Sequence, residues 1–310
     1  MLSKIVEAYE KRDLLALDAI AVPLPRTLNK TKNFKSVLML SCNKIKHLEK
    51  IKQVGSDAII LNLEDGVSKE DKPFALVLCA IYLMRHQQCD KKLIVRVNAL
   101  DEGGYEEIAY LNQFMPDAIR VPKIQNSKEV RNVLALSHRN IELHLSIETA
   151  QAWHNLHTLK VGENVTAFYL GVLDLFADMG LSHSLINLKN PTMHYILSHF
   201  LITTKAMGVK PVSFVFQEYE ELQTFKDWLH LEHSMGYDAK ACISPKQVEL
   251  VNEIFRDTEM EIQRAELIVK LFEMHQEEGI TGFSDNELGI VDEPIYKGAL
   301  ALLNKQKAPK

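Results

Sequence analysis

The chain has 310 residues, of which 36 are Lys or Arg and 41 are Asp or Glu, so its formal net charge is −5. This balance excludes the strongly basic surface of a nucleic-acid-binding protein. Hydrophobic residues make up 46% and charged residues 25%, as in an ordinary globular protein, and neither a G-x-G-x-x-G nor a Walker A pattern occurs.

The four cysteines, Cys42, Cys79, Cys89 and Cys242, are widely separated and form no C-x-x-C pair. This spacing excludes a zinc ribbon and a thioredoxin-type motif, and unpaired cysteines favour a reducing compartment. Residues 1–26 lack the uninterrupted apolar core of a signal peptide, and no window of 18 apolar residues occurs. We therefore expect a cytoplasmic protein with neither a membrane nor a nucleic acid as partner.

The chain begins with a segment that looks like an addition to a core fold. Residues 2–17 have helical periodicity, and prolines interrupt residues 22–25. We expect residues 1–35 to form an N-terminal extension with one helix and a linker. The main domain is expected to span residues 36–255, and residues 256–310 a C-terminal helical segment.

From residue 36 onward, short apolar runs rich in β-branched residues alternate with helical segments. The eight runs are 36–40, 58–63, 93–97, 118–121, 143–147, 167–170, 212–216 and 240–243. Continuous apolar runs are typical of parallel strands buried on both faces, and their spacing leaves room for a crossover helix each time. The pattern predicts an α/β fold, a TIM (β/α)₈ barrel. A doubly wound open sheet is the alternative, but it more often has a glycine-rich first turn.

Charged residues stand at the carboxyl ends of four of these runs. They are Glu64, Arg96, Glu148 and Asp174. The carboxyl ends of barrel strands converge on one face, where active sites are built. Any one of these residues could be a helix cap or a loop residue, but four charged groups at strand ends must share one opening.

Glu148 and Asp174 follow successive strands and present two carboxylates. Oxygen ligands suit Mg²⁺, whose remaining positions are filled by water and substrate oxygens, and Mn²⁺ fits as well. The alternative is that Asp174 and Glu148 cap the helices that follow them.

Arg96 lies within an apolar run, where a guanidinium is costly unless it is paired or reaches the opening of the barrel. Beside a metal it would suit a substrate carboxylate or a developing enolate oxygen. A structural ion pair with Glu64 is the alternative. The histidine pairs lack zinc-protease spacing, and no G-x-S-x-G elbow occurs, which disfavours those two hydrolase classes.

Seven short motifs and one lysine follow one another along the chain. They are residues 57–67 with Lys72 after them, and residues 96–98, 121–123, 147–150, 171–180, 236–248 and 290–294. In this order the seven motifs resemble the "LDLEDAV", "RVN", "lPK", "iETa", "GaeDlaadlG", "GfxGkxxIHPxQi" and "mIDaP" motifs of the citrate lyase beta-subunit group of the HpcH/HpaI aldolase superfamily, and Lys72 stands at the family's spacing. The resemblance covers about residues 36–303.

This resemblance implies a Mg²⁺-dependent carbon–carbon lyase that cleaves or forms a 3-hydroxyacyl-CoA such as citryl-, malyl- or citramalyl-CoA. Glu148 and Asp174 would hold the metal, and Arg96 would contact the keto-acid product and the enolate oxygen. Glu64 would orient Arg96 or metal-bound water, and Asp292 would be the acid/base at the acetyl carbon. The residues expected to contact substrate or CoA are Lys44, Arg96, Asn98 and Lys123. The resemblance also implies a homo-oligomer, typically a trimer, in which the C-terminal segment reaches a neighbouring subunit's active site.

The sequence departs from the family pattern at several positions. Asn62, Leu76, Leu173, Ser213 and Ser244 stand where the family usually has Asp, Arg, Glu, Asp and His. Two alternatives to a CoA-ester lyase therefore stay open. The protein could be an aldolase acting on free hydroxy-keto acids, or a non-catalytic barrel that has lost CoA recognition and binds a small carboxylate or a partner.

Overall fold

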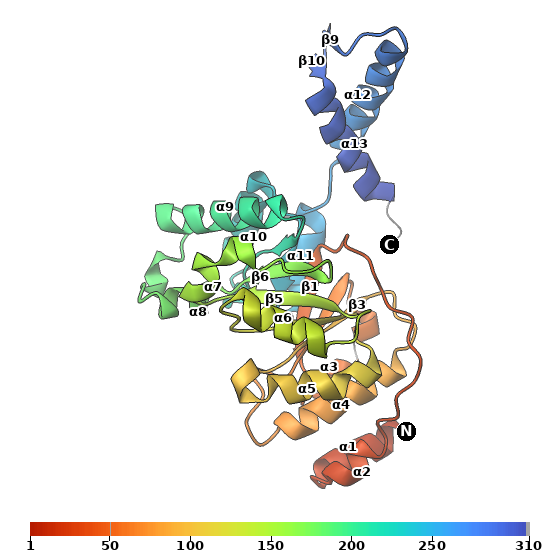
Figure 1. Ribbon diagram of the computed structural model, residues 1–310, viewed down its shortest axis with the longest axis vertical. Helices are drawn as coiled ribbons and strands as arrows, with labels where there is room; N and C mark the ends of the chain where they lie inside the picture. Colours follow the sequence, from red (N-terminus) through yellow and green to blue (C-terminus); the bar gives the residue numbers. More distant parts are fainter. Residues whose placement is uncertain (50, 308–310) are drawn as a thin grey trace. The chain divides into compact units, whose positions relative to one another are not determined.

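The computed structural model describes residues 1–49 and 51–307, which divide into two compact units, Met1–Phe255 and Arg256–Lys310 (Figure 1). The strands of the first unit are β1 Ser36–Ser41, β2 Ala58–Asn62, β3 Lys92–Arg96, β4 Ala118–Val121, β5 Glu142–Ile147, β6 Val165–Leu170, β7 Lys210–Val212 and β8 Lys240–Cys242. Its α-helices are α1 Leu2–Glu10, α2 Leu14–Asp18, α3 Ile45–Leu48, α4 Lys72–Arg85, α5 Gly104–Leu111, α6 Ser127–Leu136, α7 Ala150–His154, α8 Val172–Asp178, α9 Pro191–Ala206, α10 Leu222–Met235 and α11 Pro245–Ile254. Short 3₁₀ turns lie at Ile51–Gln53, Leu100–Glu102, Asn112–Phe114, Leu156–Thr158 and His183–Leu185.

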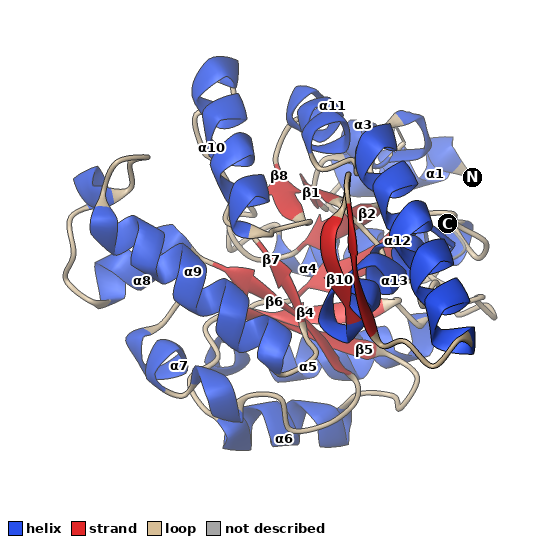
Figure 2. Ribbon diagram, turned by 90° about the horizontal axis from the view of Figure 1, so that it is seen from above, coloured by secondary structure: helices blue, strands red, loops and turns tan. Residues whose placement is uncertain are grey.

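The eight strands of the first unit are parallel and pair in the order β7-β6-β5-β4-β3-β2-β1-β8. A bridge between Ser213 and Lys240 joins the end of β7 to β8, so the sheet is a nearly closed barrel. Helices surround the strands on the outside (Figure 2). The predicted (β/α)₈ barrel is confirmed, and the doubly wound alternative is wrong.

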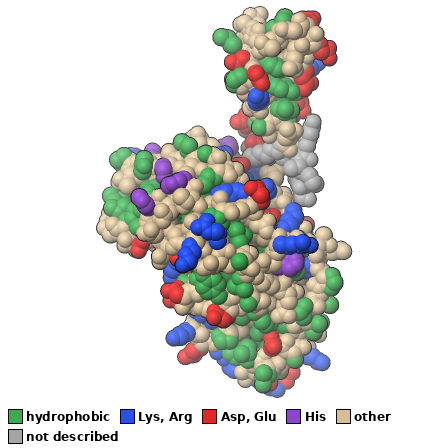
Figure 3. All heavy atoms as spheres, viewed as in Figure 1, with side chains coloured by type: hydrophobic (Ala, Val, Ile, Leu, Met, Phe, Trp, Pro, Cys, Tyr) green, Lys and Arg blue, Asp and Glu red, His purple; other side chains and the backbone are tan. Residues whose placement is uncertain are grey.

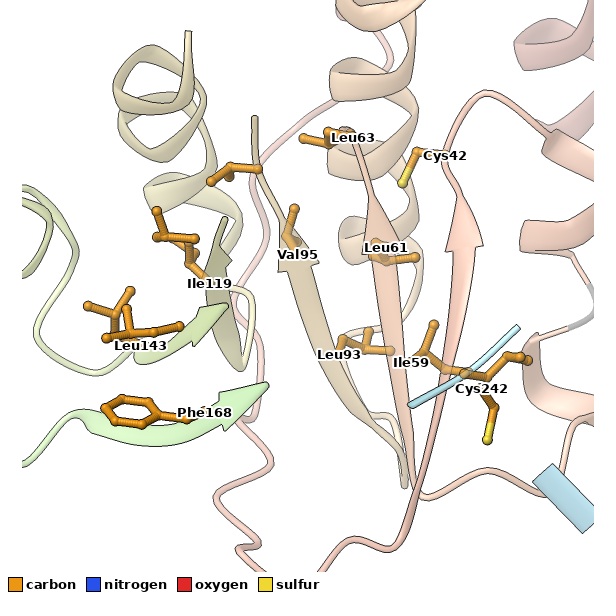
Figure 4. Close-up of a cluster of buried hydrophobic side chains, with 14 of the residues drawn as sticks. Cys42, Ile59, Leu61, Leu63, Leu93, Val95, Ile119, Leu143, Phe168 and Cys242 are labelled. Atoms are coloured by element: carbon orange, nitrogen blue, oxygen red, sulfur yellow. The ribbon is translucent and has the colours of Figure 1, made fainter. Parts of the chain in front are cut away.

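The strands are apolar on both faces because each face packs against a different core. Outward side chains such as Ile59, Leu61 and Val95 belong to a large cluster between the sheet and the helices (Figure 4). Inward side chains such as Ile60 and Ile94 belong to a second cluster inside the barrel. Burial on both faces explains why the strands read as continuous rather than alternating apolar runs.

The seventh strand is shorter and earlier than predicted. The expected run was residues 212–216, whereas β7 spans Lys210–Val212 and only Ser213 continues the pairing. The reason is packing, because Phe214 meets Trp228 of α10 edge-on, with ring centroids 5.1 Å apart. The Phe214 and Phe216 rings lie in the outer core instead of extending the sheet.

The N-terminal segment forms two helices where the sequence predicted one. The chain turns at Arg12, whose φ of 55° is left-handed, and Asp13 caps α2 by accepting a hydrogen bond from the Ala16 amide. Both helices are packed on the first unit, since Ile5 and Leu17 are buried in its outer core. The aspartate cap explains the restart of the helix after the turn.

Residues 26–34, here called the floor segment, contact residues at the amino ends of several barrel strands. Arg26 and the Asn29 amide both bind the Asp117 carboxylate, which precedes β4. Lys92, the first residue of β3, donates to the backbone carbonyls of Asn29 and Thr31. These contacts tie the N-terminal extension to the end of the barrel opposite to the carboxyl ends of the strands.

The second unit contains α12 Glu259–Glu277, β9 Gly282–Asp285, β10 Gly289–Asp292 and α13 Glu293–Lys307. Strands β9 and β10 form an antiparallel hairpin, which the prediction of a purely helical segment missed. Its small core joins Phe272 of α12 to Val291 of β10, and the Phe272 ring stacks on Tyr296 of α13 at 4.5 Å. In the described part of the chain, no helix combines the length and apolar character needed to span a membrane.

Candidate active site

The four charged residues predicted to share an opening come from the carboxyl ends of four barrel strands. Glu64 follows β2, Arg96 is the last residue of β3, Glu148 follows β5, and Asp174 lies in the first turn of α8, after β6. We call this set, together with Asp65 and Lys123, the mouth. The charges of Glu148 and Asp174 both act on Arg96, and that of Asp174 also acts on Glu148, so these three groups are neighbours.

Arg96 is buried and is held by two carboxylates. Its Nη2 contacts Glu64 Oε2 and lies 2.9 Å from Asp65 Oδ2, so the ion pair weighed as the structural alternative is present. Burial, assisted by a second arginine, Arg120, lowers the pKa of Arg96 to about 10. The guanidinium is still protonated at neutral pH. Its Nε has no hydrogen-bond partner among the described residues, which leaves one donor for a ligand.

Glu148 is the most deeply enclosed carboxylate considered for the cation, with 3% of its surface exposed. One of its oxygens, Oε1, accepts a hydrogen bond of 2.8 Å from the Lys123 amide, and Lys123 adopts a left-handed φ of 51°. A Cβ at Gly171 would come within 2.6 Å of Oε2, so only glycine leaves room for this carboxylate. Burial raises the pKa of Glu148, opposed by the charges of Arg96 and Arg120 and by the Lys123 amide.

The two predicted metal ligands are not helix caps. Thr149, not Glu148, caps α7 through the Ala152 amide, and α8 has no side-chain cap. Within residues 1–49 and 51–307, no three His, Cys, Asp or Glu side chains converge as a metal cage. Two carboxylates, with water and substrate oxygens in the remaining positions, are a donor set that suits Mg²⁺. A buried carboxylate beside an exposed one of the same charge therefore fits a divalent cation.

The other predicted site residues lie in different environments. Lys123 is half-exposed, with its Nζ 3.8 Å from Glu64 Oε1, and Lys44 is exposed at the start of α3. Asn98 is buried, donates to Glu107 and accepts from Lys72. The amide of Asn98 is thus engaged by neighbouring side chains, an arrangement that fixes the chain after β3.

Asp292 belongs to the second unit, at the end of β10. Its Oδ1 accepts a hydrogen bond of 3.2 Å from the Ile295 amide at the start of α13. Its role as an acid/base stays a prediction.

Comparison with known proteins agrees with this geometry. A sequence model described as HpcH/HpaI aldolase/citrate lyase matches residues 35–245. The chain belongs to the HpcH/HpaI aldolase/citrate lyase family. The predicted family resemblance is therefore confirmed.

Curated members of this family are similar along most of their length. A (3S)-malyl-CoA thioesterase of Cereibacter sphaeroides is 29% identical over 79% of this chain and 85% of its own length. The mitochondrial citramalyl-CoA lyase of Mus musculus is 26% identical over 86% of this chain and 83% of its own length. These relatives carry out different reactions, so membership alone does not fix the reaction.

Among solved structures, the CitE protein of Mycobacterium tuberculosis in complex with magnesium, acetoacetate and coenzyme A superposes with a TM-score of 0.70 at 19% identity. The match covers 88% of this chain and 98% of the CitE chain. It supports the barrel fold of this family member.

Sequence reasoning missed Arg120, Asp65 and Gly171. Asp65 lies beside Glu64 and shares its partner Arg96, and Gly171 makes space for Glu148. Arg120 lies inside the apolar stretch of β4, which is the same signal that drew attention to Arg96 on β3. A charged residue within an apolar run is therefore a sequence signal for Arg120 as well as for Arg96.

The histidines of α9 take no part in the mouth of this family member. His194 bonds to the Leu188 carbonyl, and the His199 ring packs against Trp153 and Tyr195. Histidine side chains are visible on the face around α9 in Figure 3, while lysine and arginine atoms lie on other parts of that surface.

Proposed function

We propose that the protein is a Mg²⁺-dependent carbon–carbon lyase that cleaves or forms a 3-hydroxyacyl-CoA of the citryl-, malyl- or citramalyl-CoA type. The observation that carries the proposal is the buried Glu148 carboxylate beside Arg96 and Asp174 at the mouth of the barrel. The family members named citramalyl-CoA lyase and (3S)-malyl-CoA thioesterase act on substrates of this class. Mn²⁺ has the same preference for oxygen ligands and is the alternative cofactor.

The residues of the mouth have separate tasks in such a reaction. Glu148 and Asp174 would hold the cation, which when bound polarises the oxygens of a 2-oxo acid and orients them. Arg96 would donate hydrogen bonds to the oxygen on which charge develops, and its protonation at neutral pH keeps that charge available. Glu64 and Asp65 would hold the guanidinium in place.

Cleavage requires the β-hydroxyl proton to pass to solvent water as the carbon–carbon bond breaks. The electron pair of that bond passes to the thioester enolate, and a proton must then be added to the enolate carbon. We propose Asp292 as the acid that delivers this proton, from a neighbouring copy in a homo-oligomer. The residues proposed to contact CoA or the substrate carboxylate are Lys44, Lys123 and Asn98. Asn98 would act indirectly, by fixing the position of the chain after β3.

The similarity to a malyl-CoA thioesterase favours hydrolysis of the thioester as a second candidate. The two reactions differ in their products. Lyase cleavage yields a 2-oxo acid and an acyl-CoA with no free thiol, whereas hydrolysis yields a free CoA thiol and a hydroxy acid.

One assay separates these outcomes. The full chain with Mg²⁺ is incubated with malyl-, citramalyl- and citryl-CoA, and 2-oxo acid and free thiol are measured in parallel. We expect 2-oxo acid without stoichiometric thiol, and its loss in Glu148→Gln but not in Glu163→Gln, which changes a fully exposed carboxylate. Release of thiol without 2-oxo acid would establish the hydrolase. If neither 2-oxo acid nor thiol is formed, the result would favour the non-catalytic alternative.

The sharing of a site between copies has its own test. Arg96→Met and Asp292→Ala are expected to be inactive alone. If Asp292 acts in the mouth of a neighbouring copy, mixing and reassembling the two variants restores part of the activity, because some mouths then combine Arg96 with Asp292. Persistent inactivity in mixed oligomers would argue against a shared site.

A further inference from the structure

Arg120 on β4 is a buried charge that the proposed reaction does not use. The residue is 5% exposed, and its Nε donates a hydrogen bond of 2.9 Å to Ser146 Oγ on β5. Its guanidinium carbon lies 4.2 Å from the centre of the Tyr169 ring on β6. An arginine has five N–H donors, and the single hydrogen bond to Ser146 leaves Nη1 without a partner among the described residues.

Three other cations of the first unit with buried ammonium or guanidinium groups are paired with carboxylates. Arg26 lies 3.3 Å from Asp117, Lys92 lies 2.9 Å from Glu142, and Lys240 contacts Glu232. For Arg120, no carboxylate of residues 1–49 and 51–307 lies within the ion-pair distance of 4.0 Å. A buried guanidinium with only a neutral hydroxyl and a ring as partners is costly, which indicates that an anion from outside the chain completes it.

Arg120 is also placed for such an anion. It pairs in register with Arg96 across β3 and β4, so both side chains leave the same face of neighbouring strands. The Arg96 and Arg120 charges repel each other, and both are attracted by Glu148 and Asp174. Two guanidinium groups therefore lie at the same level of the barrel, next to the pair of carboxylates that suits a cation.

We propose that Arg120 is a specificity-determining residue that binds the second carboxylate of a dicarboxylic 2-oxo acid. The first carboxylate and the oxo group face the cation site and Arg96, and the far carboxylate reaches Arg120 Nη1. This inference rests on the proposed function for the placement of the oxo acid, and it narrows the substrate class to thioesters whose non-CoA fragment carries two carboxylates. The planar donor edge of Arg120 suits a carboxylate better than a hydroxyl or methyl group would.

Binding of matched oxo acids tests the proposal without any turnover. Oxaloacetate and 2-oxobutyrate are close in size and differ in the second carboxylate. The wild-type chain with Mg²⁺ is titrated calorimetrically with each ligand, freshly dissolved, beside Arg120→Met and the control Arg131→Met, which changes an exposed arginine. We expect tighter binding of oxaloacetate by the wild type. In Arg120→Met its affinity should fall at least about tenfold, while that for 2-oxobutyrate stays within about twofold.

Each other outcome overturns the assignment. Equal weakening of both ligands would mean that Arg120 supports Glu148 electrostatically, and unchanged binding of both would mean that it contacts neither. A wild type without preference for oxaloacetate would also contradict it. Circular dichroism and thermal melting show whether Arg120→Met folds. If it does not, Arg120→Lys is used instead. This variant should lose only part of the preference for oxaloacetate, because a single ammonium charge replaces the parallel N–H donors of the guanidinium.

The failure of this inference is distinguishable from the failure of the proposed function. If no thioester is cleaved but oxaloacetate is still preferred in an Arg120-dependent way, the carboxylate subsite stands and the lyase function does not. Cleavage of citramalyl-CoA and malyl-CoA without that preference would leave the lyase and remove the subsite.

Discussion

The two ends of the barrel both bury charged side chains, but Asp117, Arg26 and Lys92 at the amino end have their partners within the chain. There, the Asp117 carboxylate accepts from Arg26 and from the amides of Asn29 and Leu93, and Lys92 contacts Glu142 and two carbonyls. At the mouth and on the neighbouring strand β4, by contrast, Arg96 Nε and Arg120 Nη1 have no partner in the described part of the chain.

The difference separates stabilising charge from functional charge. A buried ion pair with every donor used stabilises one arrangement, and removing either partner is costly. A buried charge with an unused donor costs stability in the free protein and gains a partner only when a ligand binds. Substitutions at the amino end should therefore lower the free energy of unfolding, whereas substitutions at the mouth should lower turnover.

The largest effect is expected from Glu148→Gln at the mouth. The amide keeps the acceptor for Lys123 but loses the negative charge for the cation, so turnover should fall roughly thousandfold or more. Because burial raises the pKa of Glu148, the charged form is disfavoured there, and the free energy of unfolding of the metal-free protein should not decrease. Initial rates and urea unfolding measure the two quantities.

The matched control is Glu163→Gln, which changes an exposed carboxylate and should alter neither quantity. A Glu148→Gln protein that is several kcal/mol less stable, as a broken buried ion pair would make it, would remove the contrast between the two ends.

The second prediction concerns the amino end. Asp117→Ala leaves Arg26 buried without its carboxylate and removes the acceptor for two amides, so the free energy of unfolding should fall by about 3–5 kcal/mol. Calorimetric Mg²⁺ binding at a temperature where the variant is folded should stay within about twofold of wild type. Loss of Mg²⁺ affinity in the folded variant would show that the floor segment also shapes the mouth.

The sequence was informative where the signal was local. Continuous apolar runs predicted all eight strands, and charges within or shortly after such runs predicted that Glu64, Arg96, Glu148 and Asp174 lie at strand ends. Arg120 carries the same local signal, but its lack of a carboxylate partner depends on which side chains of β5 and β6 face it. That three-dimensional information is absent from a pattern of apolar runs.

The contacts of the floor segment were not predictable for the same reason. Arg26 and Asp117 are separated by 91 positions, and nothing in the composition of residues 1–35 indicates that they bind the amino ends of barrel strands. The β9-β10 hairpin was missed because its strands are four residues each and partly exposed, so they lack a buried apolar run.

The third prediction uses the pH dependence of stability. His144 lies inside the barrel against Tyr169, Phe34, Glu142, Lys92 and Arg120. Burial lowers its pKa from 6.5 to about 4. Between these values the unfolded chain binds the proton and the folded chain does not, so the stability present above pH 6.5 decreases as the pH falls toward 4.

For His144 this contribution is about 3 kcal/mol. Urea unfolding at pH 7 and pH 4.5 should show a smaller loss of the free energy of unfolding in His144→Phe than in the wild type. The control His230→Gln, on the exposed side of α10, should lose as much as the wild type between the two pH values. If His144→Phe loses as much free energy of unfolding between pH 7 and pH 4.5 as the wild type, other groups cause the acid sensitivity.

The smallest effect is expected at Lys123, because its side chain and its backbone contribute differently to the mouth. The ammonium is half-exposed and lies 3.8 Å from Glu64, so Lys123→Met should raise KM only about two- to fivefold and leave kcat unchanged. The Lys123 amide, which binds Glu148, is kept in this variant.

Lys123→Gly sharpens the same point. It also keeps the amide and adopts the φ of 51° without strain, so it should share the small change in KM while its free energy of unfolding does not fall. Steady-state kinetics and urea unfolding of both variants test this division. A loss of kcat in Lys123→Met as large as that in Glu148→Gln would mean that the ammonium, rather than the amide, is the group that positions the Glu148 carboxylate.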